Sequence, residues 1–84
     1  MNLEEYKTMM MFRALTSSED LSNFKYIAAD DDGVIYVYIH KPRVMEDSMG
    51  GTWEVSYGRF PESSHHDIGI LSPHKEWNKT LMKL

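Results

Sequence analysis

The sequence predicts a small α+β domain, in which an antiparallel sheet of three to four strands carries an N-terminal and a C-terminal helix on one face. Helix-like segments stand at the two ends of the chain, and the middle is rich in β-branched and aromatic residues. An Asp-Gly pair at residues 32–33 separates two β-prone runs, which is a strong hairpin signal. No repeat or long linker divides the 84 residues, so residues 1–84 are expected to form a single domain.

The first expected helix spans residues 3–15, LEEYKTMMMFRAL, a segment without Gly or Pro. Its apolar stripe consists of Leu3, Tyr6, Met10 and Ala14. Three successive methionines cannot share that stripe, so at least one is expected at its edge or on the surface. Thr16 and Glu19 then have capping-box spacing. Either a short helical turn continues to about residue 23, or the first helix simply ends here.

Residues 24–29 and 34–40 are expected to be the two strands of the hairpin, because their side chains alternate with period two. In the second strand, the face expected to meet the helices comprises Ile35, Val37 and Ile39. The opposite face comprises Val34, Tyr36, Tyr38 and His40, and it is also largely apolar. Such a face either packs against another part of the fold or binds a partner, and both interpretations stay open. Pro42 cannot donate to a ladder, so regular pairing should weaken there.

The rest of the chain divides into two expected loops, two strands and a closing helix. The loops are residues 43–51 and 58–66, and the strands are residues 52–57 and 67–72. Ser72 is a natural N-cap and Pro73 suits the first helical position, so a helix is expected from there to the end of the sequence. Its apolar stripe would consist of Trp77, Leu81 and Leu84.

Composition excludes several classes of function. There is no cysteine, which excludes disulfides and thiolate metal sites and favours a reducing compartment. No apolar run approaches the 18 or so residues that a membrane helix needs, and the acidic start does not resemble a signal peptide. The net charge is −4 and lies in residues 1–32, whereas direct nucleic-acid binders usually carry a basic patch. Direct binding to nucleic acid or to a membrane is therefore not expected.

No arrangement of residues predicts catalysis or metal binding. Asp30 and Asp32 fit two ligand positions of a calcium loop, but Val34 and Lys41 occupy later ligand positions. Residues 63–67, SSHHD, contain the residue types of a catalytic triad, yet sequence neighbours in a loop rarely adopt triad geometry. Adjacent histidines in this stretch should point to opposite sides of an extended chain, and no zinc pattern is present. We therefore expect no enzyme activity, no cofactor and no metal site.

A spaced pattern runs through residues 26–81: YIAADDDGVIYVYIHKP, GTWEV, DIG and EWNKTL. It resembles small uncharacterised proteins of tailed bacteriophages, which carry a hairpin ending in Lys-Pro, a lone Trp, an Ile-Gly strand and a closing Trp-containing segment. Thr80 stands where the closing segment of those proteins has serine. The resemblance covers neither the N-terminal helix nor residues 43–51 and 63–66. It implies an accessory protein acting in the bacterial host cytoplasm, and it supplies no catalytic residue.

Acidic, cysteine-free phage proteins of this size often act by binding a host protein, and inhibitors of host defence such as anti-CRISPR proteins are one class. By this analogy, the chain is expected to bind and inhibit or redirect a host bacterial protein, for example a nucleic-acid-binding effector. The candidate contact residues are Asp30, Asp31, Asp32, Tyr36, Tyr38, His40 and Arg43, the last in a loop over residues 43–49. Two alternatives stay open. One is a nucleic-acid-binding module that uses Tyr36 and Tyr38 for stacking, and the other is a self-assembling virion component.

Overall fold

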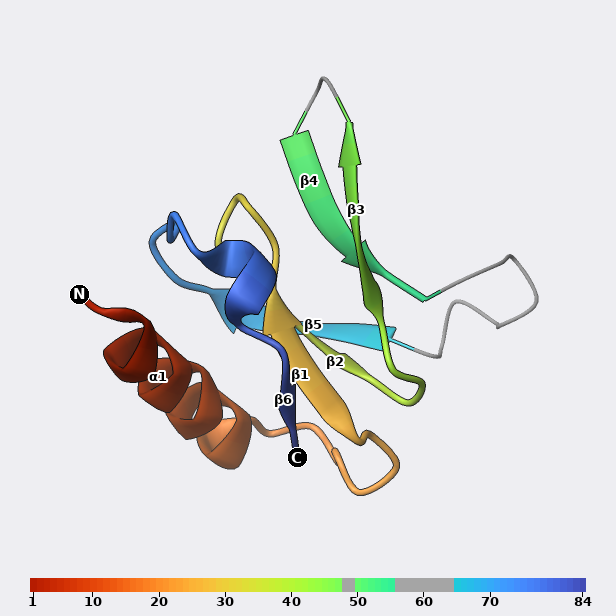
Figure 1. The fold of residues 1–84 in the computed structure, drawn as a ribbon. Coiled ribbons are helices and arrows are strands. Elements are labelled where there is room, and N and C mark those ends of the chain that lie inside the picture. The colour runs from red at the N-terminus through yellow and green to blue at the C-terminus, as the bar shows by residue number, and fades with distance from the viewer. Residues whose placement is uncertain (48–49, 56–64) are drawn as a thin grey trace.

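The computed structural model describes residues 1–47, 50–55 and 65–84. Within these ranges, helix α1 covers one face of a four-stranded antiparallel sheet, and a second sheet of two strands lies on the other side (Figure 1). Helix α1 spans Leu3–Thr16. The strands of the first sheet lie in the order β5 (His65–Ile70), β2 (Val34–Tyr38), β1 (Tyr26–Ala29) and β6 (Met82–Lys83). The second sheet pairs β3 (Arg43–Asp47) with β4 (Gly50–Glu54). The predicted α+β class and antiparallel sheet are confirmed.

Helix α1 begins and ends through local hydrogen bonds. The Asn2 side chain accepts a hydrogen bond from the backbone N–H of Glu5 at 2.8 Å, which caps the first turn. At the other end, Ser17 is extended, and its hydroxyl accepts from the backbone N–H of Glu19 at 3.1 Å. Side-chain bonds of this kind compete with helical ones, so the helix ends at Thr16 and the alternative of a helical turn to residue 23 is not formed.

The hairpin of β1 and β2 packs against other elements on both of its faces. Ile35 and Val37 face α1 and are fully buried there against Tyr6 and Met10, as predicted. Ile39 lies beyond the end of β2 and is half-buried. On the opposite face, Ala28 and Tyr38 pack against Trp53 of β4. The second face of the hairpin is therefore mainly internal packing between the two sheets.

The predicted turn between β1 and β2 is confirmed. Gly33 adopts a φ of +88°, and a Cβ at this position would lie 2.0 Å from the carbonyl oxygen of Leu71. The Asp32 carboxylate accepts a hydrogen bond from the backbone N–H of Val34 at 3.0 Å, closing the turn from within. The glycine is thus required both by the backbone conformation and by the close approach of a neighbouring strand end.

The prediction of a loop over residues 43–51 was wrong. Residues 43–47 form β3, which pairs in register with β4 from Arg43 opposite Glu54 to Asp47 opposite Gly50. β4 accordingly begins at Gly50 instead of residue 52, and residues 56–57 of the predicted strand lie outside the described residues. The second predicted loop also ends early, because His65 and His66 belong to β5, while residues 58–64 lie outside the described ranges.

The predicted C-terminal helix was also wrong. The segment forms one 3-10 turn, η2 (Trp77–Lys79), followed by β6. Trp77 and Leu81 pack on the β3–β4 side of the first sheet, whereas Met82 packs on the α1 side. A helix has a single inward face and could not serve both sides, so the extended chain that crosses the sheet edge is favoured.

Thr80 fixes this segment to β1. Its hydroxyl accepts a hydrogen bond from the backbone N–H of Ala29 at 2.9 Å and lies 2.7 Å from the carbonyl oxygen of Trp77. The same carbonyl accepts from the indole Nε1 of Trp53 at 3.2 Å. Thr80 is completely buried. The two residues of β6 pair only with Tyr26 and Ile27, so the Thr80 hydroxyl serves as the hydrogen-bond acceptor for the next edge N–H of β1, that of Ala29.

Candidate functional site

Two of the three predicted acidic contact residues hold the second sheet against the first. The carboxylate of Asp30 accepts a hydrogen bond from the backbone N–H of Trp53, and that of Asp31 accepts from the backbone N–H of Gly51, both at 2.9 Å. Asp32 is exposed and bonds within its own turn. The predicted acidic tip is therefore largely a structural junction, with two of its three carboxylates turned toward β4.

Burial changes the acidity of Asp30. The residue is only 7% exposed, and this desolvation raises the pKa of its carboxyl to about 6, opposed by the hydrogen bond from Trp53. The nearby carboxylates Asp31, Asp32 and Glu54 raise the pKa further. Asp30 therefore exchanges its proton close to neutral pH, unlike an ordinary surface aspartate.

The predicted tyrosine face separates into three different environments. Tyr38 is 2% exposed because Trp53 covers it, and its hydroxyl donates a 3.4 Å hydrogen bond to the Trp53 carbonyl. Tyr36 is half-buried, and His40 is exposed in the bend that follows β2. The face thus combines internal packing at Tyr38 with an accessible surface at Tyr36.

His65 adds a third ring to this face. It stands opposite Tyr38 in the β2–β5 register, and its ring centroid lies 6.1 Å from that of Tyr38 and 5.8 Å from that of Tyr36. The two tyrosine rings are 6.2 Å apart. These three rings form the aromatic wall of a cleft between the sheets.

The cleft lies between β2 and β5 on one side and β4 on the other. A cavity of about 310 Å³ is lined by Tyr38, Trp53, Glu54, Val55 and His65. An adjoining cavity of about 210 Å³ shares four of these residues and adds Asp30, Tyr36 and Thr52. We call the two cavities together the inter-sheet cleft. Its lining combines aromatic rings with two carboxylates, a mixture suited to recognition of a polar or charged group.

The structure brings together some of the predicted contact residues and separates others. Asp30, Tyr36 and Tyr38 meet in the inter-sheet cleft, Asp30 from the turn that follows β1 and the two tyrosines from β2. Arg43 begins β3, where it is exposed and stands opposite Glu54 in the register. Asp31 lines a neighbouring cavity of about 350 Å³ beside β3 and β4, which shares Thr52 and Glu54 with the cleft.

Sequence reasoning missed Trp53, Glu54 and His65 as residues of this site. Each comes from a strand far from the first hairpin in the chain, and only the packing of β4 over β2 and the pairing of β5 with β2 bring them there. One available signal was the alternation in residues 65–70, which places His65 on the side opposite to His66.

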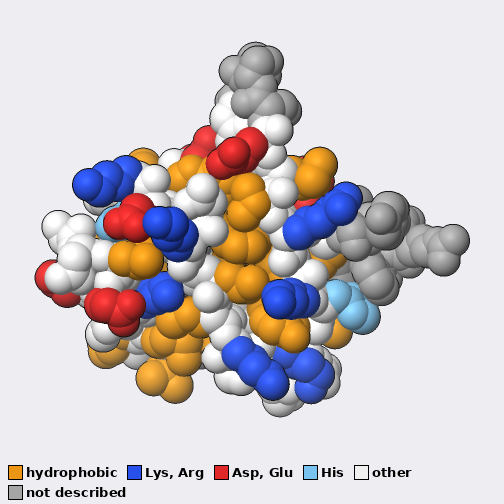
Figure 2. Space-filling model, viewed as in Figure 1, with side chains coloured by type: hydrophobic (Ala, Val, Ile, Leu, Met, Phe, Trp, Pro, Cys, Tyr) orange, Lys and Arg blue, Asp and Glu red, His pale blue; other side chains and the backbone are white. Residues whose placement is uncertain are grey.

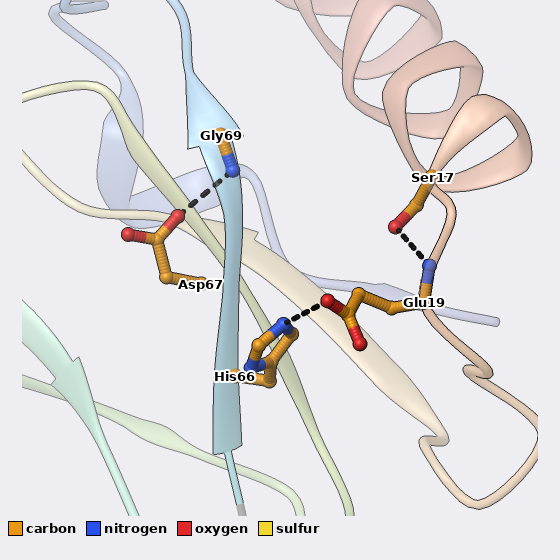
Figure 3. Close-up of polar contacts among 5 residues, drawn as sticks. All are labelled: Ser17, Glu19, His66, Asp67 and Gly69. Carbon is orange, nitrogen blue, oxygen red and sulfur yellow. Dashed lines mark hydrogen bonds and ion pairs between the residues drawn. The ribbon is translucent and has the colours of Figure 1, made fainter.

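The predicted opposite orientation of these two histidines is confirmed. His65 faces the tyrosines, whereas His66 points toward the segment after α1 and lies 3.8 Å from the carboxylate of Glu19 (Figure 3). Farther along β5, the side chain of Asp67 accepts from the backbone N–H of Gly69 at 2.8 Å. The His66–Glu19 pair is largely exposed, so it adds little to stability and takes no part in the cleft.

Within residues 1–47, 50–55 and 65–84, no group of three or more histidine and acidic side chains is placed to hold a metal ion. The same residues include no helix long and apolar enough to cross a membrane. No known family model matches the chain, and no curated protein or solved structure is significantly similar to it.

Proposed function

We propose that this chain is a small interaction protein that binds a protein partner through the inter-sheet cleft. The observation that carries the proposal is the combination of Tyr36, Trp53 and His65 with the carboxylates of Asp30 and Glu54 around one cavity. Aromatic side chains supply large rigid contact surfaces and are enriched where proteins bind one another. Polar groups among them fix the orientation of the bound segment.

The setting of the proposal comes from the phage resemblance. In that setting the partner is a host bacterial protein in the cytoplasm, which the chain inhibits or redirects, and a component of a defence system is the leading class. Asp30 and Asp31 do not form a free acidic tip that a partner could contact, because their carboxylates are bonded to β4. Since Asp30 and Asp31 hold the second sheet, the accessible charge of the site is carried by Glu54, whose side chain is exposed at the edge of the cleft.

The test is recovery of a partner from host lysate with wild type and a Glu54→Lys variant. Reversing this exposed charge should strongly reduce recovery without unfolding the protein, because Glu54 is not part of either buried cluster. Glu46→Lys is the matched control, since Glu46 is exposed on the same hairpin but does not line the inter-sheet cleft. Equal recovery by all three proteins would remove the cleft as the binding site.

A second candidate is self-association through α1, in keeping with a structural component. Phe12 and Leu15 are 67% and 80% exposed, and Met9 is 41% exposed on the same helix. Figure 2 shows hydrophobic side chains at the surface on the side of the molecule where α1 lies. Light scattering of wild type and a Phe12→Ser, Leu15→Ser variant tests this candidate. Self-association through α1 predicts an oligomeric mass for wild type and a monomeric mass for the variant.

The nucleic-acid alternative receives less support from the geometry. Tyr38 is covered by Trp53, so a stacking platform of Tyr36 and Tyr38 is not presented to solvent. The carboxylates of Asp30 and Glu54 line the same cleft and would repel phosphates. A gel shift at low salt with single-stranded DNA and RNA is the direct measurement, and binding there would restore this alternative.

A further inference from the structure

The charge of the inter-sheet cleft is unbalanced. Among the described residues that line it there are two carboxylates, Asp30 and Glu54, and no lysine or arginine. Asp30 has lost most of its contact with water, which raises the pKa of its carboxyl. The Trp53 N–H lowers this pKa, and the neighbouring carboxylates raise it further. A buried carboxylate is normally paired with a cation or protonated, because ionisation without water is unfavourable. Asp30 accepts a hydrogen bond from the Trp53 N–H, and a cation entering the cleft would add a positive charge that the lining residues do not supply.

The walls of the cleft suit a flat, weakly hydrated cation. Tyr36, Tyr38 and His65 present neighbouring rings, and Trp53 stands across from them on β4. A cation over such a ring is attracted by its negative face, most strongly by indole. A phosphate or carboxylate ligand would be repelled by Asp30 and Glu54. A purely hydrophobic ligand would displace water from the cleft and add no opposite charge beside Asp30 and Glu54.

We propose that the inter-sheet cleft binds the guanidinium group of an arginine that a partner protein presents. The inference rests on the function proposed above and names the chemical group that the cleft recognises. Guanidinium is planar, stacks on aromatic rings and offers several N–H donors to carboxylate oxygens, whereas the ammonium of lysine is compact and strongly hydrated. Tyr36, His65 and Trp53 provide the ring surfaces, and Asp30 and Glu54 provide the acceptors.

Binding of a cation should be linked to ionisation of Asp30. Because the buried carboxyl holds its proton up to about pH 6, arginine binding must displace that proton in acid solution and becomes tighter as the pH rises above 6. The other ionisable groups near Asp30 are Asp31, Asp32, Glu54 and the phenols of Tyr36 and Tyr38, and His65 lines the cleft. A His65→Gln variant removes the imidazole from the cleft and so isolates the contribution of Asp30.

The experiment is an NMR titration of the whole protein with N-acetyl-arginine amide. We expect saturable shifts at the backbone amide and indole of Trp53, with the lysine and citrulline analogues binding more weakly. Citrulline keeps the shape of arginine and lacks its charge, so loss of one cation–π and one ionic contact should weaken it by about tenfold. Raising the pH from 5 to 7.5 should strengthen arginine binding in wild type and in His65→Gln, but not in Asp30→Asn.

Two exposed-charge variants complete the test. Glu54→Gln should weaken arginine binding by about threefold, the effect of one exposed ion pair, whereas Glu46→Gln should leave it unchanged. The proposal is overturned if the arginine and citrulline analogues bind equally, or if neither shifts the Trp53 signals. If that happens while Glu54→Lys still abolishes partner recovery, the cleft binds protein by other chemistry and the proposed function stands. If partner recovery is also insensitive to Glu54, both proposals fail.

Discussion

The carboxylate of Asp30 lies 2.9 Å from the backbone nitrogen of Trp53, and this hydrogen bond joins the first hairpin to the second sheet. Asp30→Asn keeps an oxygen acceptor and removes the buried charge, so at pH 7.5 its free energy of unfolding should equal or slightly exceed that of wild type. Asp30→Ala leaves the Trp53 N–H buried without an acceptor and should be destabilised by about 1–3 kcal/mol. Urea denaturation of the three proteins measures both effects. Equal loss of stability in both variants would show that the charge itself is required.

The same carboxyl predicts a dependence of stability on pH. Its pKa is raised from the ordinary 3.8 to about 6 in the folded protein, so the folded state binds the proton more tightly than the unfolded state. This contribution is fully present below about pH 4 and is lost as the pH rises through 6. After allowance for partial hydration, it amounts to about 1 kcal/mol. Thermal melts between pH 4.5 and 7.5 should show the decline in wild type, and the difference from Asp30→Asn should vanish at the acid end.

Thr80 gives a prediction for the edge of β1. Thr80→Val keeps the shape of the side chain but leaves the buried N–H of Ala29 without its acceptor, so it should be destabilising by about 1–3 kcal/mol. Thr80→Ser keeps the hydroxyl and should lose less, since only one methyl group is removed. Chemical denaturation of both variants is the measurement. A Val variant as stable as the Ser variant would contradict the assigned role of the hydroxyl.

Removing the hydroxyl of Tyr6 should not reduce the stability of the protein. Its hydroxyl is buried and has no hydrogen-bond partner within the part of the chain that the structure describes. Tyr6→Phe removes an unsatisfied polar group, so stability should be unchanged or increased by up to about 1 kcal/mol. Tyr38→Phe is the comparison, because it removes a hydroxyl that does donate to the Trp53 carbonyl. A clear loss of stability in Tyr6→Phe would point to a bound water or another partner for this hydroxyl.

Gly51 predicts a steric effect between β4 and η2. A Cβ at this position would lie 2.4 Å from the Trp77 ring, so Gly51→Ala should displace the ring and destabilise the protein by about 1–3 kcal/mol. The displacement should also change the tryptophan fluorescence. In a Trp77→Leu background the same substitution should have a much smaller effect, because the ring atoms that it meets are gone. Additive effects in the two backgrounds would rule out this contact as the cause.

Local sequence signals were sufficient for α1 and for the β1–β2 hairpin. The Asn2 cap, the stripe containing Tyr6 and Met10, and the turn at Gly33 all act over a few residues, so the chain itself specifies them. β3 could not be predicted in this way. Its residues are mostly exposed and carry no apolar alternation, and the strand exists because it pairs with β4.

Tertiary packing overrode local preference at the C-terminal end. The spacing of Trp77, Leu81 and Leu84 is helical, but the hydroxyl of Thr80 and the needs of two packed faces favour an extended segment. The candidate site shows the same division. Asp30, Tyr36 and Tyr38 stood out in the sequence, whereas Glu54 and His65 reach the cleft through contacts between strands distant in the chain.

The carbonyl of Trp77 accepts hydrogen bonds from both the Trp53 indole and Thr80, and this has a consequence for local opening. Fraying of the last residues withdraws Thr80, releases this carbonyl and frees the indole that forms one wall of the cleft. We therefore expect residues 77–83 and the Trp53 side of the cleft to open together. Their amide hydrogens should exchange with solvent together, and a ligand that occupies the cleft should slow exchange at the edge of β1 as well.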